Sequence, residues 1–344
     1  MTDMLNFASD YVGGAHPKVL SRLVETNGLK TPGYGTDEFC ESAKKKILDL
    51  CKRDGARVYF LVGGTQTNAT VISSILRGYQ GVISAALGHI ATHESGAIEA
   101  TGHKVITLPG HDGKLLPSEV DAAFRAYFED ESREHTVMPG AVYVSHPTEV
   151  GTLYTKDELR ALSEICHRNG AYLFLDGARL GYGLMAEGTD LTLSDIAAYT
   201  DVFYIGGTKV GALFGEAVVV TDPELCPFFV SSIKQHGALL AKGRLLGVQF
   251  DALFSDGLYF EISRAALDAA KYLKSRLISL GYKFLIDSPT NQQFVIIEND
   301  KIDKIREKVI CNFWQKYDEK TSVLRFVTSF DTTREDIDAL ISLM

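Results

Sequence analysis

Residues 171–179 read Ala-Tyr-Leu-Phe-Leu-Asp-Gly-Ala-Arg, an apolar run that ends in Asp176 and Arg179. Residues 202–209 read Val-Phe-Tyr-Ile-Gly-Gly-Thr-Lys, a second apolar run followed by a glycine-rich turn and Lys209. Both runs have the length and composition of buried strands. In open α/β sheets, ligands bind outside the carboxyl ends of the strands. The two stretches therefore predict that Asp176 and Lys209 lie close together at one edge of a sheet.

A lysine amine and a buried carboxylate in this arrangement can hold pyridoxal 5'-phosphate at both ends of its ring. Lys209 would bind the aldehyde carbon as a Schiff base, and Asp176 would hold the protonated ring nitrogen. Each residue alone has a simpler interpretation. Asp176 could cap a helix or pair with Arg179, and Lys209 could be a solvated loop charge. We favour the cofactor hypothesis because both residues occur together, and it predicts an enzyme of amino-acid chemistry.

Residues 63–68, Gly-Gly-Thr-Gln-Thr-Asn, lie between a predicted strand and a predicted helix. Free backbone N–H groups at the start of a helix, with hydroxyls beside them, bind phosphate well. The pattern is neither a Walker A loop nor G-x-G-x-x-G, so a nucleoside triphosphate or a dinucleotide is not indicated. Thr208 could offer a further hydroxyl to the same phosphate. A tight strand-to-helix turn is the alternative interpretation.

Strands alternate with helices over the first two thirds of the chain. Such alternation predicts an α/β fold with a mostly parallel mixed sheet and helices on both faces. Thr155 and Glu158 form a predicted capping box at the start of one of these helices. The expected strands are 58–62, 82–85, 105–108, 142–145, 171–175, 202–205 and 217–220, and the clearest expected helices are 17–25, 38–52 and 119–128.

The pattern changes after residue 242. A long helical region over 244–280, broken near Asp256-Gly257, precedes a strand at 293–297, a helix at 301–310, a strand at 322–327 and a helix opened by Thr333. This order predicts a small α+β domain. We expect an N-terminal arm over 1–40, a large cofactor-binding domain over 41–242 and a small C-terminal domain over 243–344.

The bulk composition excludes several classes of function. A net charge of -9 argues against a nucleic-acid surface and against an anionic membrane. No apolar run approaches the ~18 residues of a membrane helix, and no signal peptide is apparent, so we expect a cytoplasmic protein. The five cysteines are scattered without a C-x-x-C pair, so no metal site is expected.

Arg325 and three histidines complete the candidate site. Arg325 lies within the apolar run 323–327, and an inward-facing arginine there needs an anion such as a substrate α-carboxylate. An outward-facing arginine on a half-exposed strand is the alternative. His89 could stack on a flat cofactor ring. His93 and His146 are further candidates for proton transfer.

These residues together resemble a known family. The chain resembles the L-threonine aldolases, particularly the low-specificity bacterial branch, of the pyridoxal-phosphate-dependent aspartate aminotransferase fold (fold type I). The resemblance covers nearly the whole chain. The segments that carry it are 7–10 (FASD), 34–37 (YGTD), 63–68 (GGTQTN), 88–90 (GHI), 94–97 (ESGA), 147–152 (PTEVGT), 175–180 (LDGARL), 207–209 (GTK) and 324–329 (LRFVTS).

The resemblance implies a role for each matching residue. Lys209 is the Schiff-base lysine, Asp176 the partner of the ring nitrogen and His89 the residue stacked on the ring. The implied phosphate ligands are Gly64, Thr65 and Thr208, and the implied substrate ligands are Ser9, Tyr34, Arg179 and Arg325, with Arg179 also near the cofactor. Such enzymes pair active sites across a dimer, often within a tetramer, and Lys242 and Arg244 are expected to reach the neighbour's cofactor phosphate.

The implied reaction is retro-aldol cleavage of L-threonine, L-allo-threonine or a related substrate such as phenylserine to glycine and an aldehyde. Many members carry Glu-Asn-Thr-His where this chain has Ser145-His146-Pro147-Thr148-Glu149, so the general base stays open among His89, His93, His146 and a water molecule. One alternative is another fold type I enzyme, a β-eliminating lyase or an aminotransferase. Another is a relative that binds a ligand or a partner without turnover.

Overall fold

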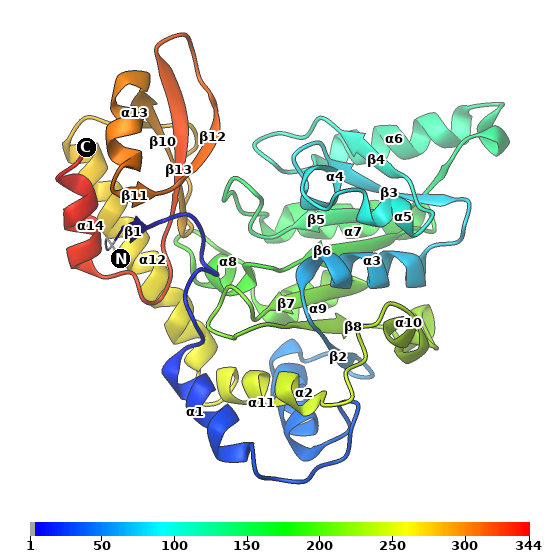
Figure 1. The fold of residues 1–344 in the computed structure, drawn as a ribbon. Coiled ribbons are helices and arrows are strands. Elements are labelled where there is room, and N and C mark those ends of the chain that lie inside the picture. The colour runs from blue at the N-terminus through cyan, green and yellow to red at the C-terminus, as the bar shows by residue number, and fades with distance from the viewer. Residues whose placement is uncertain (1–3) are drawn as a thin grey trace.

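The fold is organised around a large mixed sheet (Figure 1). The computed structural model describes residues 4–344. Seven strands follow the order β2-β8-β7-β6-β5-β3-β4. β8 is antiparallel to both of its neighbours, and the other pairs are parallel. The strands are β2 (Arg57–Leu61), β3 (Gln80–Ala85), β4 (Val105–Leu108), β5 (Met138–Ser145), β6 (Tyr172–Asp176), β7 (Val202–Gly206) and β8 (Glu216–Val220).

Successive side chains of the central strands alternate between two hydrophobic cores. Val142 and Val144 of β5 enter one core, whereas Ala141 and Tyr143 enter the other. Both faces of the sheet are therefore buried, which explains the continuous apolar runs in the sequence. The mostly parallel α/β sheet predicted from that pattern is confirmed.

Helices cover both faces of the sheet. The first core also contains side chains from α1 (Pro17–Thr26), α2 (Glu38–Cys51), α6 (Pro117–Glu129), α7 (Lys156–Arg168), α8 (Leu180–Met185), α9 (Leu193–Tyr199), α11 (Arg244–Leu253) and α12 (Leu258–Ser279). The second core contains side chains from α3 (Gly64–Ile75), α4 (His89–Thr92), α5 (Ala97–Ala100) and α10 (Phe229–Gln235).

The C-terminal third forms a smaller α+β unit. A four-stranded antiparallel sheet has the order β12-β13-β10-β9. Its strands are β9 (Lys283–Phe284), β10 (Gln292–Glu298), β12 (Asn312–Lys316) and β13 (Thr321–Val327). A separate parallel pair joins β1 (Leu5–Asn6) to β11 (Val309–Ile310). The helices α13 (Asn299–Arg306) and α14 (Arg334–Ile341) complete the unit. Two short 3₁₀ helices lie earlier in the chain, η1 (Arg133–His135) and η2 (Pro223–Leu225).

Two expectations for this unit are wrong. The helix expected over 301–310 is α13, which ends at Arg306, because Val309 and Ile310 pair instead with β1 from the other end of the chain. Strand β12 was not predicted. A register shift between Phe313 and Gln315 breaks the alternation by which a strand is recognised.

Local signals located several other boundaries correctly. The Thr155 side chain caps α7 with Glu158 in a capping box, and Thr333 caps α14. The helix break near Asp256-Gly257 is confirmed, since both residues have positive φ, 52° and 75°. The patterns did not predict α8, α9 and α10, which are only 6 or 7 residues long.

The division at residues 40 and 242 stays a proposal. It assigns α11 to the C-terminal unit, although α11 packs against α1 and α2. Residues 1–3 of the proposed arm lie outside the described part of the chain. Within residues 4–344, no helix has the length and apolar composition needed to span a bilayer.

Candidate active site

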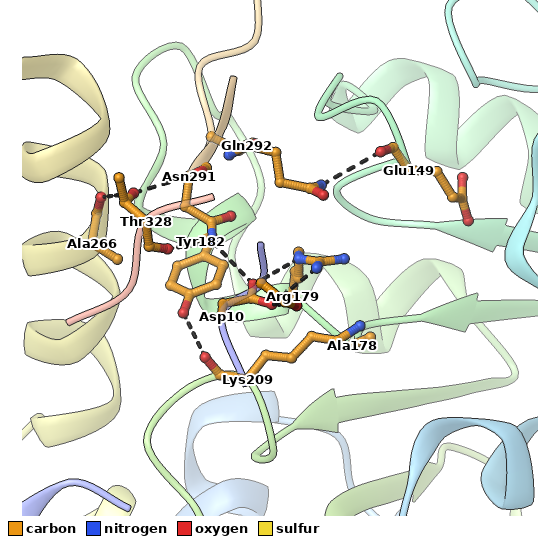
Figure 2. Close-up of polar contacts among 12 residues, drawn as sticks. Asp10, Glu149, Ala178, Arg179, Tyr182, Lys209, Ala266, Asn291, Gln292 and Thr328 are labelled. Atoms are coloured by element: carbon orange, nitrogen blue, oxygen red, sulfur yellow. Dashed lines mark hydrogen bonds and ion pairs between the residues drawn. The ribbon is translucent and has the colours of Figure 1, made fainter. Parts of the chain in front are cut away.

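Lys209 lies in the loop that reverses the chain between β7 and β8. The N–H groups of Gly207 and Thr208 both donate to the Gly215 carbonyl, at 2.9 and 3.1 Å. A Cβ at Gly207 would lie 2.8 Å from that carbonyl oxygen, so glycine is required there for the chain to approach itself. The Tyr182 hydroxyl donates to the Lys209 carbonyl at 2.5 Å (Figure 2). The backbone of Lys209 is thus held from two sides.

The environment of Lys209 favours its neutral amine. Burial lowers the pKa of the Lys209 ammonium, and the neighbouring Arg179 charge lowers it further. The carboxylates of Asp10 and Asp176 oppose this shift without reversing it. An amine must be neutral to attack a carbonyl carbon, so the lowered pKa favours nucleophilic chemistry at Lys209.

Asp176 ends β6 and accepts three hydrogen bonds. Its Oδ2 accepts from the Tyr143 hydroxyl at 2.5 Å and from the Asn68 amide at 3.2 Å, and its Oδ1 accepts from the Ala178 N–H at 2.9 Å. These donors hold the carboxylate in one orientation. The alternative of an ion pair between Asp176 and Arg179 is wrong, because Arg179 pairs with another carboxylate.

A polar network continues from Asp176 to His89. Asn68 also donates to Glu94 Oε1 at 2.7 Å, and the same oxygen lies 2.8 Å from His89 Nδ1. Burial lowers the pKa of His89, but the hydrogen bond to Glu94 and the charge of Asp176 outweigh it, so the pKa lies above its usual value. The ring is therefore fixed in orientation and more basic than a free imidazole.

The start of α3 provides donors for an anion. Gly63 occupies the N-cap position, and no side chain caps this end of the 12-residue helix. Gly63, Gly64 and Thr65 line one cavity together with Thr208. Uncapped N–H groups and the positive end of the helix dipole attract a phosphate. The residues present therefore fit the phosphate end of pyridoxal phosphate.

Glu216 lies beside this phosphate cradle. Its Oε1 accepts from the Thr208 hydroxyl at 2.9 Å, whereas the buried Oε2 has no partner among the described residues. Burial raises the pKa of Glu216 to about 8. The raised pKa favours the neutral acid, which repels a phosphate less than a carboxylate would.

Arg179 has a buried carboxylate partner. Its Nε and Nη2 donate to the two oxygens of Asp10, at 2.7 and 2.9 Å (Figure 2). Asn291 donates to the same carboxylate at 3.0 Å, and the Ser9 hydroxyl donates at 3.2 Å. Burial raises the pKa of Asp10, but the charges of Arg179 and Lys209 outweigh it and hold the pKa below its usual value. Arg179 is thus largely neutralised within the chain.

Arg325 has only neutral acceptors. It donates to Gln292 Oε1 at 3.1 Å and to the Ala8 carbonyl at 3.4 Å, and its buried Nε has no partner among the described residues. Burial and the neighbouring Arg179 charge lower the pKa of Arg325 to about 10. A buried cation without a counter-charge is costly, so this site favours an anionic ligand.

Two adjoining cavities contain these groups. The inner cavity, of about 270 Å³, is lined by Gly63, Gly64, Thr65, Asp176, Thr208 and Glu216 among others. The outer cavity, of about 620 Å³, is lined by Ser9, His93, Arg325 and residues of β12. Five residues line both: Tyr11, His89, Glu149, Arg179 and Lys209. The junction of the cavities therefore combines the amine of Lys209 with groups that can transfer protons.

The chain matches known proteins over almost its full length. The profile of the beta-eliminating lyase family matches residues 6–298. A low specificity L-threonine aldolase of Pseudomonas sp. (strain NCIMB 10558) is 30% identical over 337 residues, which cover 96% of this chain and 95% of that protein. The chain belongs to the beta-eliminating lyase family and, within it, to the threonine aldolases.

Solved structures agree with this membership. The structure of Leishmania major threonine aldolase is 43% identical, with a TM-score of 0.95 and 98% of each chain covered. The aspartate aminotransferase of Thermus thermophilus, at 18% identity and a TM-score of 0.69, covers 99% of this chain and 91% of its own. At that identity it shares only the fold, which is fold type I.

Several residues singled out from the sequence lie elsewhere in this chain. Tyr34 lines a separate cavity of about 140 Å³. Lys242 is exposed. Arg244 donates to the carbonyls of residues 26, 27 and 29 at the end of α1. None of the three lines the inner or the outer cavity, so any contact with a cofactor requires a second subunit.

The histidine candidates for the general base differ in which cavity they line. His146 is buried, its Nδ1 accepts from the Tyr154 N–H at 3.3 Å, and burial lowers its pKa to about 4. It lines neither cavity. His93 lines only the outer cavity, with its ring 5.7 Å from that of His89.

Sequence reasoning missed several residues of the site. Asp10 and Glu149 belong to the FASD and PTEVGT segments, which carry the resemblance to the threonine aldolases. Their membership in these segments could have identified them as candidate site residues. Phe313 and Trp314 line the outer cavity from β12, which was not predicted as a strand. Asn68 and Glu94 act through buried contacts, for which spacing gives no signal.

Proposed function

We propose that this chain is a pyridoxal-phosphate-dependent aldolase that cleaves L-threonine, L-allo-threonine or related β-hydroxy-α-amino acids such as phenylserine to glycine and an aldehyde. The names of the relatives at 30% and 43% identity support this activity. The alternative of a β-eliminating lyase or an aminotransferase is not favoured, because the relatives at 30% and 43% identity are both named threonine aldolases and the aminotransferase of known structure shares only the fold.

Residues of the inner cavity would hold the cofactor. Lys209 supplies the amine for its aldehyde carbon, and Asp176 supplies the carboxylate for its ring nitrogen. The uncapped start of α3, with Gly64 and Thr65, suits its phosphate, together with Thr208, while His89 is placed to stack on the ring. When bound, the cofactor supplies an electron sink for the bond that breaks at Cα of the substrate.

Residues of the outer cavity would hold the amino acid. Arg325 is a partly buried cation with no carboxylate partner among the described residues, so we assign it the main contact to the α-carboxylate, with Ser9 beside it. Arg179 contributes through its remaining N–H groups, because two of its five donors bind Asp10. Fixing the carboxylate fixes which bond at Cα is aligned for cleavage.

One observation carries this proposal: Lys209 and Asp176 line the same cavity as the uncapped start of α3. The test is to load the protein with pyridoxal phosphate, record its visible spectrum and incubate it with L-threonine and phenylserine. We expect a visible band, glycine and the matching aldehyde from the wild type, and loss of both band and turnover from Lys209→Ala. Pyruvate or amino transfer in place of an aldehyde would refute the proposal.

We further propose a cytoplasmic homo-oligomer, a dimer or a dimer of dimers with active sites shared between subunits. Tyr34 and Lys242 are exposed in the isolated chain and lie outside its inner and outer cavities. The proposed partners are small amino acids, with no nucleic acid and no membrane. Light scattering of the loaded protein tests the oligomeric state, and a monomer that is fully active would refute the shared site.

A further inference from the structure

Glu149 is a half-buried acid that no role assigned so far explains. It follows β5 and lines both the inner and the outer cavity. Its Oε1 accepts from the His89 backbone N–H at 2.9 Å and from the Ser145 hydroxyl at 2.6 Å. Both donors bind the same oxygen, which leaves Oε2 without a bond to a described residue. One oxygen therefore orients the carboxylate, and the other is free to act on a ligand.

The backbone around Glu149 is also held firmly. The Thr148 N–H donates to the Thr152 carbonyl at 3.0 Å, and the hydroxyls of the same two residues lie 2.7 Å apart. Gln292 of β10 donates to the Glu149 carbonyl at 3.5 Å (Figure 2). The loop is thus attached to the smaller unit as well as to β5, and the carboxylate keeps its position at the junction of the cavities.

The proposed reaction requires a proton acceptor at this junction. The phosphate and ring contacts lie in the inner cavity and the carboxylate contact in the outer cavity, so the substrate carbons lie between them. Of the five residues that line both cavities, Arg179 is paired, Tyr11 is a largely exposed phenol and Lys209 is needed for the cofactor. His89 and Glu149 remain, and Glu94 already engages Nδ1 of His89.

We propose that Glu149 is the general base that removes the β-hydroxyl proton in the cleavage step. The proton passes to the carboxylate, the O–H electron pair becomes the second bond of the aldehyde C=O, and the Cα–Cβ bond breaks with its electron pair left on Cα. The proton held by Glu149 is then available to return to Cα as glycine forms. This inference rests on the proposed aldolase function.

The surroundings of Glu149 suit this role. Burial and the charge of Asp176 raise the pKa of the Glu149 carboxyl, and the hydrogen bonds from Ser145 and His89 only partly oppose this. A carboxylate with a raised pKa accepts a proton more readily than an ordinary glutamate does. Burial raises the pKa of the nearby Tyr143 and Tyr154 hydroxyls, and the charge of Glu149 also raises it. The titratable groups that share its two cavities are Tyr11, His89, His93, Asp176, Arg179, Tyr204, Lys209, Glu216, Arg306, Cys311 and Arg325.

The test compares Glu149→Gln with wild type in the cofactor-loaded protein. The amide oxygen of glutamine still accepts from His89 and Ser145, but the side chain no longer titrates. We expect cleavage of L-threonine to fall about 10²- to 10⁴-fold. Glycine, which has no β-hydroxyl, should bind with the wild-type dissociation constant in a spectral titration. The acidic limb of the wild-type pH profile, set by Glu149, should be absent from the variant.

Matched variants make the outcome decisive. Glu158→Gln removes a carboxylate that pairs with Lys114 outside both cavities, and it should retain wild-type cleavage. His93→Asn tests the histidine of the outer cavity as a further candidate base, and loss of the acidic limb there but not in Glu149→Gln would overturn the proposal. Loss of glycine binding in Glu149→Gln would show a structural role and also overturn it.

The two proposals fail in different ways. If wild-type protein releases no aldehyde, the aldolase assignment and the role of Glu149 fall together. If wild-type protein cleaves L-threonine and Glu149→Gln does so at a similar rate with the same pH profile, only the role of Glu149 is refuted.

Discussion

Arg325→Gln should weaken binding of the amino-acid carboxylate while leaving the protein folded. A hydrogen bond to a charged group contributes about 1.5–3 kcal/mol, which corresponds to roughly 10- to 100-fold in a dissociation constant. Arg325 has no acidic partner in the described chain, so its charge is available to the ligand. We therefore expect the dissociation constant of glycine to rise by about this factor.

The unloaded variant should be at least as stable as wild type. Burial and the Arg179 charge both disfavour the Arg325 cation, as its lowered pKa of about 10 indicates. Removing the cation relieves both effects. Guanidinium unfolding followed by circular dichroism measures this, and a large loss of stability would mean that Arg325 serves mainly to hold the fold.

Glycine binding is measured from the change in the visible spectrum of the loaded protein. Arg306→Gln is the matched control, because Arg306 also lines the outer cavity but is exposed. Salt screens exposed charges, so this control should change the dissociation constant by less than about threefold. A similarly small change in Arg325→Gln would refute its assignment as the carboxylate ligand.

Two further predictions concern stability. Asp10→Asn removes the counter-charge of Arg179 and should lower the free energy of unfolding by about 3–5 kcal/mol. The control Asp338→Asn, in an exposed ion pair, should lower it by less than about 1 kcal/mol. Equal losses for the two variants in guanidinium unfolding would contradict this prediction. Folding raises the pKa of His89, so protonated His89 stabilises the folded state. This stabilisation is fully present below the unfolded-state pKa of about 6.5 and is lost as the pH rises through the folded-state pKa. The stability of wild type relative to His89→Asn should therefore decrease as the pH rises above about 6.5, and an increase in that direction would refute the sign.

Much of the fold was predictable because its strands are buried on both faces. Continuous apolar runs such as 171–175 identify central strands, and turn residues mark where each strand ends. Strand β12 was not predictable in this way, because a bulge disrupts its alternation. Strand β11 depends on a partner more than 300 positions earlier in the chain, so local pattern could not reveal it.

The site divides in a similar way. Lys209, Asp176 and the 63–68 turn follow strand ends, where position along the sheet predicts proximity. The partner of Arg179 was not predictable, because Asp10 and Arg179 are brought together only by the packing of the N-terminal segment. Glu149 was overlooked because a single acid in a loop is usually solvated. Only the three-dimensional arrangement shows that it lines both cavities.

The pairing of β1 with β11 has a consequence for how the protein is made. Residues 5–10 leave the ribosome roughly 300 residues before their partners, Val309, Val327 and Asn291, have been synthesised. During translation the apolar side chains of this segment cannot yet be buried, and Asp10 lacks the hydrogen bond from Asn291. The outer cavity includes Ser9, so it is completed only after the end of the chain has emerged and folded. A nascent chain can therefore form its large sheet early, while a working active site is assembled last.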